Sequence, residues 1–463
     1  LLPALDAARA APAQALKAGD EQRMFARAVK AWPGLMCLLL SLAFIPLKPV
    51  DGIPVAGYLS IACLLLGGVF LMPFLSGLVF RKLEARSPSS MLALAQLRGA
   101  PGQAMVSLAA IVASFSLMAA MAIMVASFRS SVDDWLGAVL PAELYFRTTQ
   151  AGETAWIAPE LEARVRQLPQ VERAVFVRSQ RILLDAARPP VALLARDSYA
   201  IRFPPVGKEY ERRPDEPPPA WISEAVADLY GFSPGNEIEI PIAGKQLAFV
   251  VAGVWRDYAR QHGAIVVERE TYVALTGDRR ANDAALWLKP GADPAALERA
   301  LRALPGGQLL EIAGAAEIRQ VSLAIFDRSF AVTYALEAVA VLVGLFGLSS
   351  SVGAIVLARR REFGMLRHLG MTRRQIGAML AAEGGLLAVL GVAVGLALGG
   401  AISLVLIHVV NRQSFNWSMD VQPPYGLLSV LSLTLVFLSV ATAWWSGREA
   451  TGIGPVRAVK EDW

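Results

Sequence analysis

Apolar residues along this chain gather into six blocks separated by polar stretches. A transmembrane helix needs about 20 mostly apolar residues to cross about 30 Å of hydrocarbon. The first block is the weakest of the six, because it is short and ends at Pro46 and Pro49. The pattern predicts an α-helical integral membrane protein with about six spans. These cover roughly residues 33–47, 58–80, 105–128, 330–357, 376–410 and 426–445.

Lys and Arg residues beside the blocks indicate on which side of the membrane each connection lies, because basic loops stay in the cytoplasm. Every second connection is basic, whereas connections 48–57 and 411–425 are short and poor in cations. We therefore expect a multi-pass protein of the bacterial cytoplasmic (inner) membrane with both termini cytoplasmic. The basic groups are Arg9, Lys17, Arg23, Arg27 and Lys30; Arg81, Lys82, Arg86 and Arg98; Arg359, Arg360, Arg361, Arg367, Arg373 and Arg374; and Arg448, Arg457 and Lys460.

Residues 129–329 form a long polar stretch that this assignment places outside the cytoplasm. Period-2 alternation predicts strands in it, and period-3.6 patterns predict helices. We expect helices at 158–167, 223–230 and 294–304, and strands at 237–242, 246–254, 264–267 and 284–288. The stretch is therefore predicted to be one large α+β extracytoplasmic domain.

Composition supports a membrane protein and argues against a nucleic-acid partner. Hydrophobic residues make up 55% of the chain and charged residues 18%, whereas about a quarter of the residues of a soluble domain are charged. The net charge of +5 is distributed beside the apolar blocks and forms no single basic stripe of the kind that binds nucleic acid.

The two ends of the chain share a short pattern, Pro-x-x-Ala-apolar-Lys, at residues 12–17 and 455–460. The second copy follows a four-span unit directly. If the first copy also closes such a unit, residues 1–32 are the cytoplasmic tail of a preceding permease module, and residues 33–80 are two linker transmembrane helices. We therefore expect the chain to begin within a longer gene product. The partner in the membrane is then that preceding module or a second permease copy.

The segment from Ala358 to Ile376 is the most informative run in the sequence. Apolar residues recur there at helical spacing between arginines, which is typical of a helix lying along the membrane interface. We expect this helix at about 359–371, ended by Gly370 and followed by Thr372 as the cap of the next span. The simpler alternative is a stop-transfer cluster with an ordinary surface helix.

This run resembles the signature of the FtsX-like permease family, which includes MacB, the lipoprotein-sorting Lol permeases and YbbP-like members. The matching residues are Arg361, Glu362, Leu366, Gly370, Arg374, Gln375 and Glu383. Residues 91–102, within the stretch 81–104, resemble the amphipathic entry helix before the family's first module span. Residues 222–235 and 251–255 resemble its periplasmic core domain, and 411–417 are similar to a loop of two-module, ten-span members. Together these matches cover nearly all of residues 90–463.

The resemblance implies a permease whose ATPase is a separate chain, so that ATP and Mg²⁺ bind to that partner and this chain carries no cofactor. It implies that the helix after the second module span docks on an ABC ATPase dimer and transmits its closure. The substrate would be hydrophobic, lipid or lipoprotein-like, and exported or extracted from the outer leaflet or periplasm. Membrane lipid and a periplasmic protein are further candidate partners. The predicted ATPase-coupling residues are Arg360, Arg361, Glu362, Phe363, Leu366, Arg367, Leu369, Gly370, Arg373 and Arg374.

No phosphate-binding loop of the form Gly-x-x-x-x-Gly-Lys-Ser/Thr occurs, and the three histidines are scattered, so we expect a non-catalytic subunit. Two rival functions remain. One is an FtsX-type transmembrane regulator of an extracytoplasmic hydrolase, although single-module regulators have smaller outer domains. The other is a membrane-anchored enzyme with its active site in residues 129–328, for which no acid–base or metal pattern is visible.

Glu383 lies near the start of the fifth predicted span, where an intramembrane carboxylate suggests a function. Two roles are open for it. A structural ion pair with an arginine is favoured over proton coupling, because the residue lies within about two helical turns of the predicted cytoplasmic face.

Overall fold

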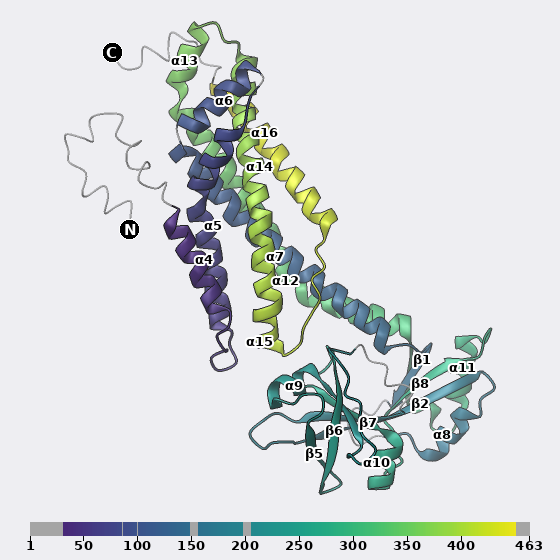
Figure 1. Ribbon diagram of the computed structural model, residues 1–463. Helices are drawn as coiled ribbons and strands as arrows, with labels where there is room; N and C mark the ends of the chain where they lie inside the picture. The colour runs from purple at the N-terminus through teal and green to yellow at the C-terminus, as the bar shows by residue number, and fades with distance from the viewer. Residues whose placement is uncertain (1–30, 86, 100, 149–155, 198–204, 451–463) are drawn as a thin grey trace. The chain divides into compact units, whose positions relative to one another are not determined.

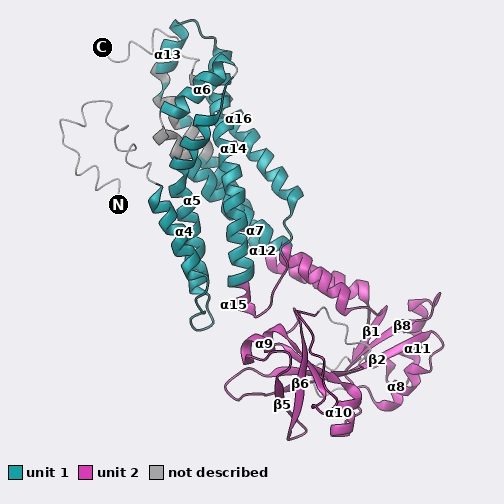
Figure 2. Ribbon diagram, viewed as in Figure 1, with its two compact units in different colours: residues 1–126, 332–410, 421–463 teal, residues 127–331, 411–420 magenta. Residues whose placement is uncertain are grey.

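The computed structural model of this 463-residue chain describes residues 31–85, 87–99, 101–148, 156–197 and 205–450 (Figure 1). The chain divides into two compact units (Figure 2). The first comprises residues 1–126, 332–410 and 421–463, and the second residues 127–331 and 411–420. Residues 1–30 of the predicted module tail (1–32) and both copies of the terminal pattern lie outside the described residues.

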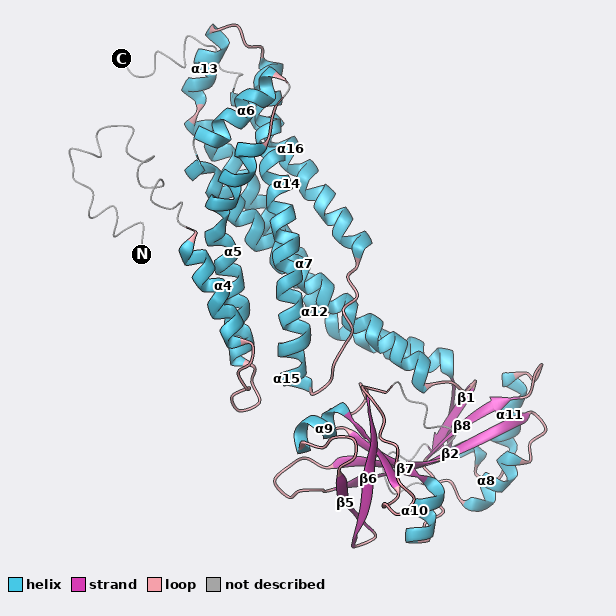
Figure 3. Ribbon diagram, viewed as in Figure 1, coloured by secondary structure: helices cyan, strands magenta, loops and turns pink. Residues whose placement is uncertain are grey.

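The first unit is a bundle of helices (Figure 3). A helix occupies each of the six predicted apolar blocks, and the predicted entry helix is present as α6, which buries Ala93, Leu94 and Leu97. The elements are α4 (Trp32–Phe44), α5 (Val55–Lys82), α6 (Pro88–Gly99), α7 (Pro101–Val139), α12 (Ala315–Ala358), α13 (Arg360–His368), α14 (Arg373–Val405) and α16 (Tyr425–Ala450). The helices α7 and α12 continue into the second unit.

Four helices in the described part of the chain are long and apolar enough to cross a membrane: Val55–Lys82, Leu108–Val139, Arg373–Phe415 and Tyr425–Arg448. The helix α4, with 13 residues, extends only about 20 Å at 1.5 Å per residue, which is short of the hydrocarbon thickness. The helix α12 contains the predicted span 330–357, and several of its side chains lie outside the described residues. The protein thus has several apolar helices that could span a membrane, and the number six remains a prediction.

The glycines of α14 let α7 approach closely, as small residues do between helices in lipid. A Cβ atom at Gly395 would lie 2.9 Å from the Phe115 ring. At Gly399 it would lie 2.7 Å from the backbone oxygen of Ser116. Larger residues at these two positions would push the helices apart.

The second unit contains a nine-stranded mixed sheet, which confirms the predicted α+β class. The strand order is β5-β6-β4-β7-β3-β2-β8-β1-β9, with β3–β7 and β4–β6 parallel and the other pairs antiparallel. The strands are β1 (Leu144–Thr148), β2 (Val171–Ile182), β3 (Val191–Arg196), β4 (Pro219–Ser223), β5 (Glu237–Ile242), β6 (Lys245–Trp255), β7 (Ala264–Glu268), β8 (Asp283–Leu288) and β9 (Leu310–Gly314).

Two apolar cores lie along this sheet, and β2 joins them. One core gathers β3 to β7 with α9 (Glu224–Tyr230) and α10 (Arg269–Thr276). The other gathers β1, β2, β8 and β9 with α8 (Pro159–Arg166) and α11 (Pro294–Ala303). The first half of β2 pairs with β8 and the second half with β3. One 12-residue strand therefore holds both halves of the domain together.

The predicted strands and helices of this domain are present within two residues of their expected ends. Five strands (β1, β2, β3, β4 and β9) and the helix α10 had no sequence prediction. The apolar helices also differ from expectation, because α7 continues to Val139 and α12 begins at Ala315. Hydropathy marks only the membrane-crossing part of a helix, so it missed these polar extensions.

Candidate coupling site

The joint between α12 and α13 is built on Arg359, whose side chain is only 6% exposed. Its Nη1 donates to Glu383 Oε2 of α14 at 3.0 Å, and its Nε donates to Glu362 Oε2 at 2.9 Å. The guanidinium also lies 5.3 Å from the centre of the Phe363 ring. One buried cation therefore ties the start of α13 to α14. Its paired carboxylates compensate the cost of burying that charge.

Phe363 anchors α13 in the helical unit. It is 1% exposed and belongs to a buried apolar cluster in which four other helices meet. Its neighbours are Ala93 of α6, Ile111 of α7, Ile376, Met379 and Leu380 of α14, and Ala443 of α16. A movement of α13 therefore displaces the helices that pack against Phe363, because a close-packed interior transmits strain.

The far end of α13 stops abruptly and restarts as α14. The Gly370 N–H donates to the Arg367 carbonyl and the Met371 N–H to the Leu366 carbonyl, which is the Schellman pattern. Gly370 has φ +97°, a conformation that favours glycine. Thr372 and Gln375 then form a capping box, with each side chain accepting from the other's backbone N–H. The predicted stop and start are both present.

The outer face of α13 carries exposed apolar side chains. Met365 and Leu369 are four residues apart, so they lie on one helix face, and they are 59% and 82% exposed. Arg373 and Arg374, which begin α14 directly after this helix, are also exposed. An exposed apolar pair beside cations is typical of a surface that contacts another protein.

The predicted coupling residues divide between the inside and the outside of the helical unit. Phe363 is buried and Leu366 and Arg367 are half-buried, so Phe363 cannot contact a partner directly. Glu362, Leu369, Gly370, Arg373 and Arg374 are exposed, whereas the side chains of Arg360 and Arg361 lie outside the described part. The sequence prediction omitted Arg359 and Met365. The i, i+4 spacing of Met365 and Leu369 could have revealed Met365. No local signal marks Arg359, because its partner Glu383 lies 24 residues away.

Two ion pairs join the polar extensions of α7 and α12 in the second unit. Arg319 binds Asp133 through two hydrogen bonds of 2.5 and 2.7 Å. Arg129 binds Asp327 with Nε 3.0 Å from Oδ1. Bidentate arginine–carboxylate pairs restrict both distance and orientation. The two extensions therefore form a braced stalk, which we define as residues 127–139 and 315–331.

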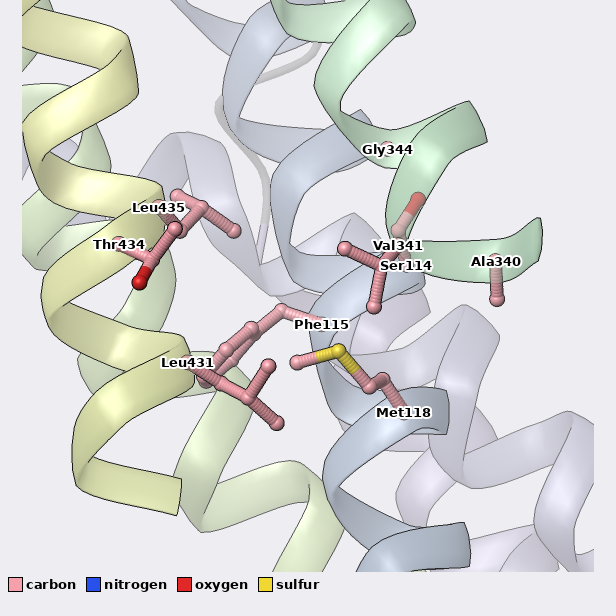
Figure 4. Close-up of a pocket in the computed structure, with 9 residues that line it drawn as sticks. All are labelled: Ser114, Phe115, Met118, Ala340, Val341, Gly344, Leu431, Thr434 and Leu435. Carbon is pink, nitrogen blue, oxygen red and sulfur yellow. The ribbon is translucent and has the colours of Figure 1, made fainter. Parts of the chain in front are cut away.

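A small apolar cavity lies among α7, α12 and α16 (Figure 4). Phe115, Met118, Leu431 and Leu435 line it, and Ser114 and Thr434 are its polar members. Its volume of about 30 Å³ has room for only a few water molecules, so it does not hold an acyl chain in this conformation. Among the described residues, no group of three or more His, Cys, Asp or Glu side chains could hold a metal ion.

Two family models match the chain over adjoining regions. The MacB-like periplasmic core domain matches residues 104–304, and the FtsX-like permease C-terminal model matches residues 335–455. The chain belongs to the FtsX/MacB-type ABC transporter permeases. The resemblance carried by the run 358–376 is thereby confirmed, and permeases of this type are generally non-catalytic subunits.

Curated relatives of this permease chain are ABC transporter permeases of uncharacterised function. The permease protein Rv0987 of Mycobacterium tuberculosis is 24% identical over 97% of this chain and 55% of its own length. The permease MJ1507 of Methanocaldococcus jannaschii is 20% identical over 47% of this chain and 56% of its own length. The chain thus spans about half the length of the curated relatives it matches.

Two solved structures are weakly similar to part of this permease chain. The periplasmic region of MacB from Actinobacillus actinomycetemcomitans is 11% identical with a TM-score of 0.30, and covers 40% of this chain and 94% of its own. The extracellular domain of the noncanonic ABC-type transporter YknZ from Gram-positive bacteria is 14% identical with a TM-score of 0.27, and covers 37% and 98%. Because both TM-scores are low, the family assignment rests on the two family models and not on these structures.

Proposed function

We propose that this chain is the membrane-spanning subunit of an ABC transporter whose ATP is hydrolysed by a separate ATPase chain. In this proposal, ATP and Mg²⁺ bind only to the ATPase dimer. Closure of that dimer pushes on α13, and the motion reaches the MacB-like domain outside the cytoplasm. The substrate is a hydrophobic, lipid or lipoprotein-like molecule that is exported or extracted. The protein lies in the bacterial inner membrane with α13 and both termini on the cytoplasmic side.

The construction of α13 supports this proposal best. Its inner face is fixed by buried Phe363 and by the Arg359–Glu383 ion pair, while its outer face presents Met365 and Leu369. A short helix built in this way can receive a force from a partner on one side and pass it to α14 on the other. An isolated surface helix would need neither a buried ring nor a buried ion pair.

The stalk offers a route from this helix to the sheet domain. The helix α12 runs from Ala315 to Ala358 without interruption, so its ends lie in the stalk and at the joint with α13. Helices transmit displacement along their axes because every backbone hydrogen bond is intrahelical. The ion pairs of the stalk then make α7 move with α12.

The proposal is tested with Leu369→Asp in the full permease, produced together with its ABC ATPase and placed in lipid nanodiscs. Because Leu369 is 82% exposed, the change should leave the permease folded. We expect loss of co-purification with the ATPase and a fall of roughly tenfold in coupled ATP turnover, as for removal of an interface anchor. Leu309→Asp is the matched control, since Leu309 is an exposed leucine of the sheet domain.

Unchanged co-purification and turnover for Leu369→Asp would contradict docking through this face of α13. The readouts also separate the rival functions. Turnover stimulated by added lipid or lipoprotein supports the transporter. Activation of an outer hydrolase without such stimulation would support the regulator, and catalysis by the permease alone would support an anchored enzyme.

A further inference from the structure

The loop between α14 and α16 has a defined conformation of its own. It follows a π-helix, Leu406–Asn411, and a short helix α15, Arg412–Phe415. Asn416 then takes φ +57°, and the Asn411 side chain donates to the Trp417 carbonyl at 3.0 Å. A π-helical turn interrupts the regular helix pattern and is frequent at functional sites. The loop is therefore held in one shape.

Residues 411–420 belong to the compact unit that contains the sheet, and two arginine–aspartate pairs fix them there. Arg412 donates from Nε and Nη2 to both carboxylate oxygens of Asp228, each at 3.1 Å. Arg256 donates to both oxygens of Asp420, at 2.6 and 3.1 Å. Both pairs are bidentate, so they specify orientation as well as proximity.

Ser418 is bound on three sides between these two pairs. Its backbone N–H and its hydroxyl both donate to the Glu224 carboxylate, at 2.9 and 2.7 Å. Its hydroxyl oxygen accepts from Arg256 Nε at 3.1 Å, and its carbonyl accepts from the Tyr258 hydroxyl at 2.8 Å. Glu224 is only 5% exposed, so these two hydrogen bonds offset part of the cost of burying its charge. Burial raises the pKa of Tyr258 to about 12, which keeps its hydroxyl a donor at neutral pH.

An aromatic group packs against the same segment. The Trp417 ring is 5.6 Å from Tyr258 and 6.1 Å from Phe128, measured between ring centres. It also stacks on Phe415 at 5.4 Å. Trp417 is 9% exposed, so its ring is buried by the sheet unit and the stalk. The segment is bound by charge, hydrogen bonds and apolar packing together.

We propose that residues 411–420 form a clasp that gives α13 a second path to the sheet domain, through α14 and in parallel with the α12 stalk. The inference rests on the proposed function. The helix α14 begins directly after α13 at the Thr372 capping box and is tied to it by Glu383. It continues through the π-helix into Arg412. A displacement of α13 therefore reaches Asp228 and Glu224 through covalent helix and the clasp.

The ionic part of the clasp can be opened without disturbing the sheet. The Asp420 side chain is 64% exposed and lies in the loop, outside every strand. In Asp420→Arg, a cation faces Arg256 in place of the carboxylate. We expect roughly fivefold faster hydrogen exchange across 416–420, in line with loss of a partly exposed ion pair. The double variant Arg256→Asp/Asp420→Arg restores opposite charges and should recover part of the protection. Recovery should stay incomplete, because the new Asp at position 256 lies near Glu224 and the two carboxylates repel each other. Lys245→Asp reverses an exposed charge elsewhere in the domain and is the control.

The test follows hydrogen exchange by mass spectrometry in the full permease with its ATPase in nanodiscs, with and without a slowly hydrolysed ATP analogue. In the parent and in Lys245→Asp, the nucleotide should change exchange both at 224–228 and at 129–139. In Asp420→Arg, we expect the change at 224–228 to be reduced, because the Arg412–Asp228 pair still holds the segment, and the change at 129–139 to remain. The double variant should regain the response at 224–228.

Two results would contradict the second path through the clasp. One leaves the proposed function intact, and the other contradicts it as well. If Asp420→Arg opens the loop but keeps the full nucleotide response at 224–228, the stalk alone carries the motion and the proposed function stands. If the parent shows no nucleotide response in either segment, the proposed function fails and the second path fails with it.

Discussion

The pairing of Arg359 with Glu383 decides how firmly α13 is held, and a single substitution tests it. Both side chains are at most 10% exposed, so removing the Glu383 charge leaves the buried Arg359 with the partly exposed Glu362 as its remaining carboxylate among the described ion pairs. We expect Glu383→Gln to destabilise the helical unit by about 3 kcal/mol and to lower ATP turnover and transport together. Thermal unfolding in detergent and coupled turnover measure this.

A double variant and the pattern of activity loss show what Glu383→Gln has removed. The double variant Arg359→Met/Glu383→Leu removes both charges and should recover much of the stability, as replacement of a buried pair by apolar side chains does elsewhere. Loss of transport by Glu383→Gln with normal assembly and normal turnover would instead favour proton coupling, and the structural role would be rejected.

Asp278 is a second residue whose charge state matters, in this case in the sheet domain. Burial raises its pKa, but hydrogen bonds from Arg280 and the charge of Arg178 outweigh burial and hold the pKa at about 2. The folded value is below the unfolded value of about 3.9. The carboxylate therefore stabilises the fold above about pH 4, and this contribution is lost as pH falls through 2.

The predicted consequence is that Asp278→Asn lowers the free energy of unfolding by about 2 kcal/mol at pH 7 and by much less at pH 2. Denaturant unfolding followed by tryptophan fluorescence in detergent measures the difference. Asp293→Asn, which changes an exposed carboxylate of the same domain, is the control. An equal cost of Asp278→Asn at both pH values would show that the ion pairs of this carboxylate contribute nothing.

At the scale of single elements, the turn between α13 and α14 depends on one backbone conformation. Gly370 has φ +97° and open space around its Cβ position, so only the conformation penalises a side chain there. Gly370→Ala should cost about 1–2 kcal/mol and fray the end of α13, which would weaken ATPase coupling before it affects assembly. Gly400→Ala inside α14 also meets open space and should be neutral or stabilising. Equal stability of the two variants, measured by thermal unfolding, would contradict the Schellman assignment.

At the scale of the whole molecule, sidedness is the prediction on which the proposed function depends most. Single cysteines replace Arg373 in α14 and Glu237 in β5, in a background where Cys37 and Cys63 are changed to serine or alanine. Both native cysteines lie half-buried in apolar helices. In intact cells, a membrane-impermeant maleimide should label position 237 and spare position 373 until the membrane is opened. Labelling of both positions from one side would remove the assignment of α13 to the cytoplasmic face.

Signals between near neighbours in the chain were readable from the sequence. The apolar blocks, the stop at Gly370 and the cap at Thr372 each depend on residues within one or two helical turns, so pattern and composition determine them. The strand 237–242 was equally visible, because alternation within a strand reflects its own two faces. The strand predicted at 264–267 is instead a short continuous apolar run, as expected of a strand buried on both faces. Together these local patterns predicted a membrane protein with an α+β domain, and the resemblance carried by the run 358–376 pointed to the family.

The tertiary structure decided which distant residues meet. Arg359 pairs with Glu383, 24 positions away, and Arg256 with Asp420, 164 positions away. Nothing in the local sequence distinguishes either arginine from the other arginines of its segment, so its carboxylate partner could not be predicted. The strand β2 was also missed, because its buried residues belong to two different apolar cores and do not alternate regularly. Periodicity records only which face of an element is buried, whereas the identity of the covering residue follows from chain packing, and the coupling joint and the clasp both depend on that packing.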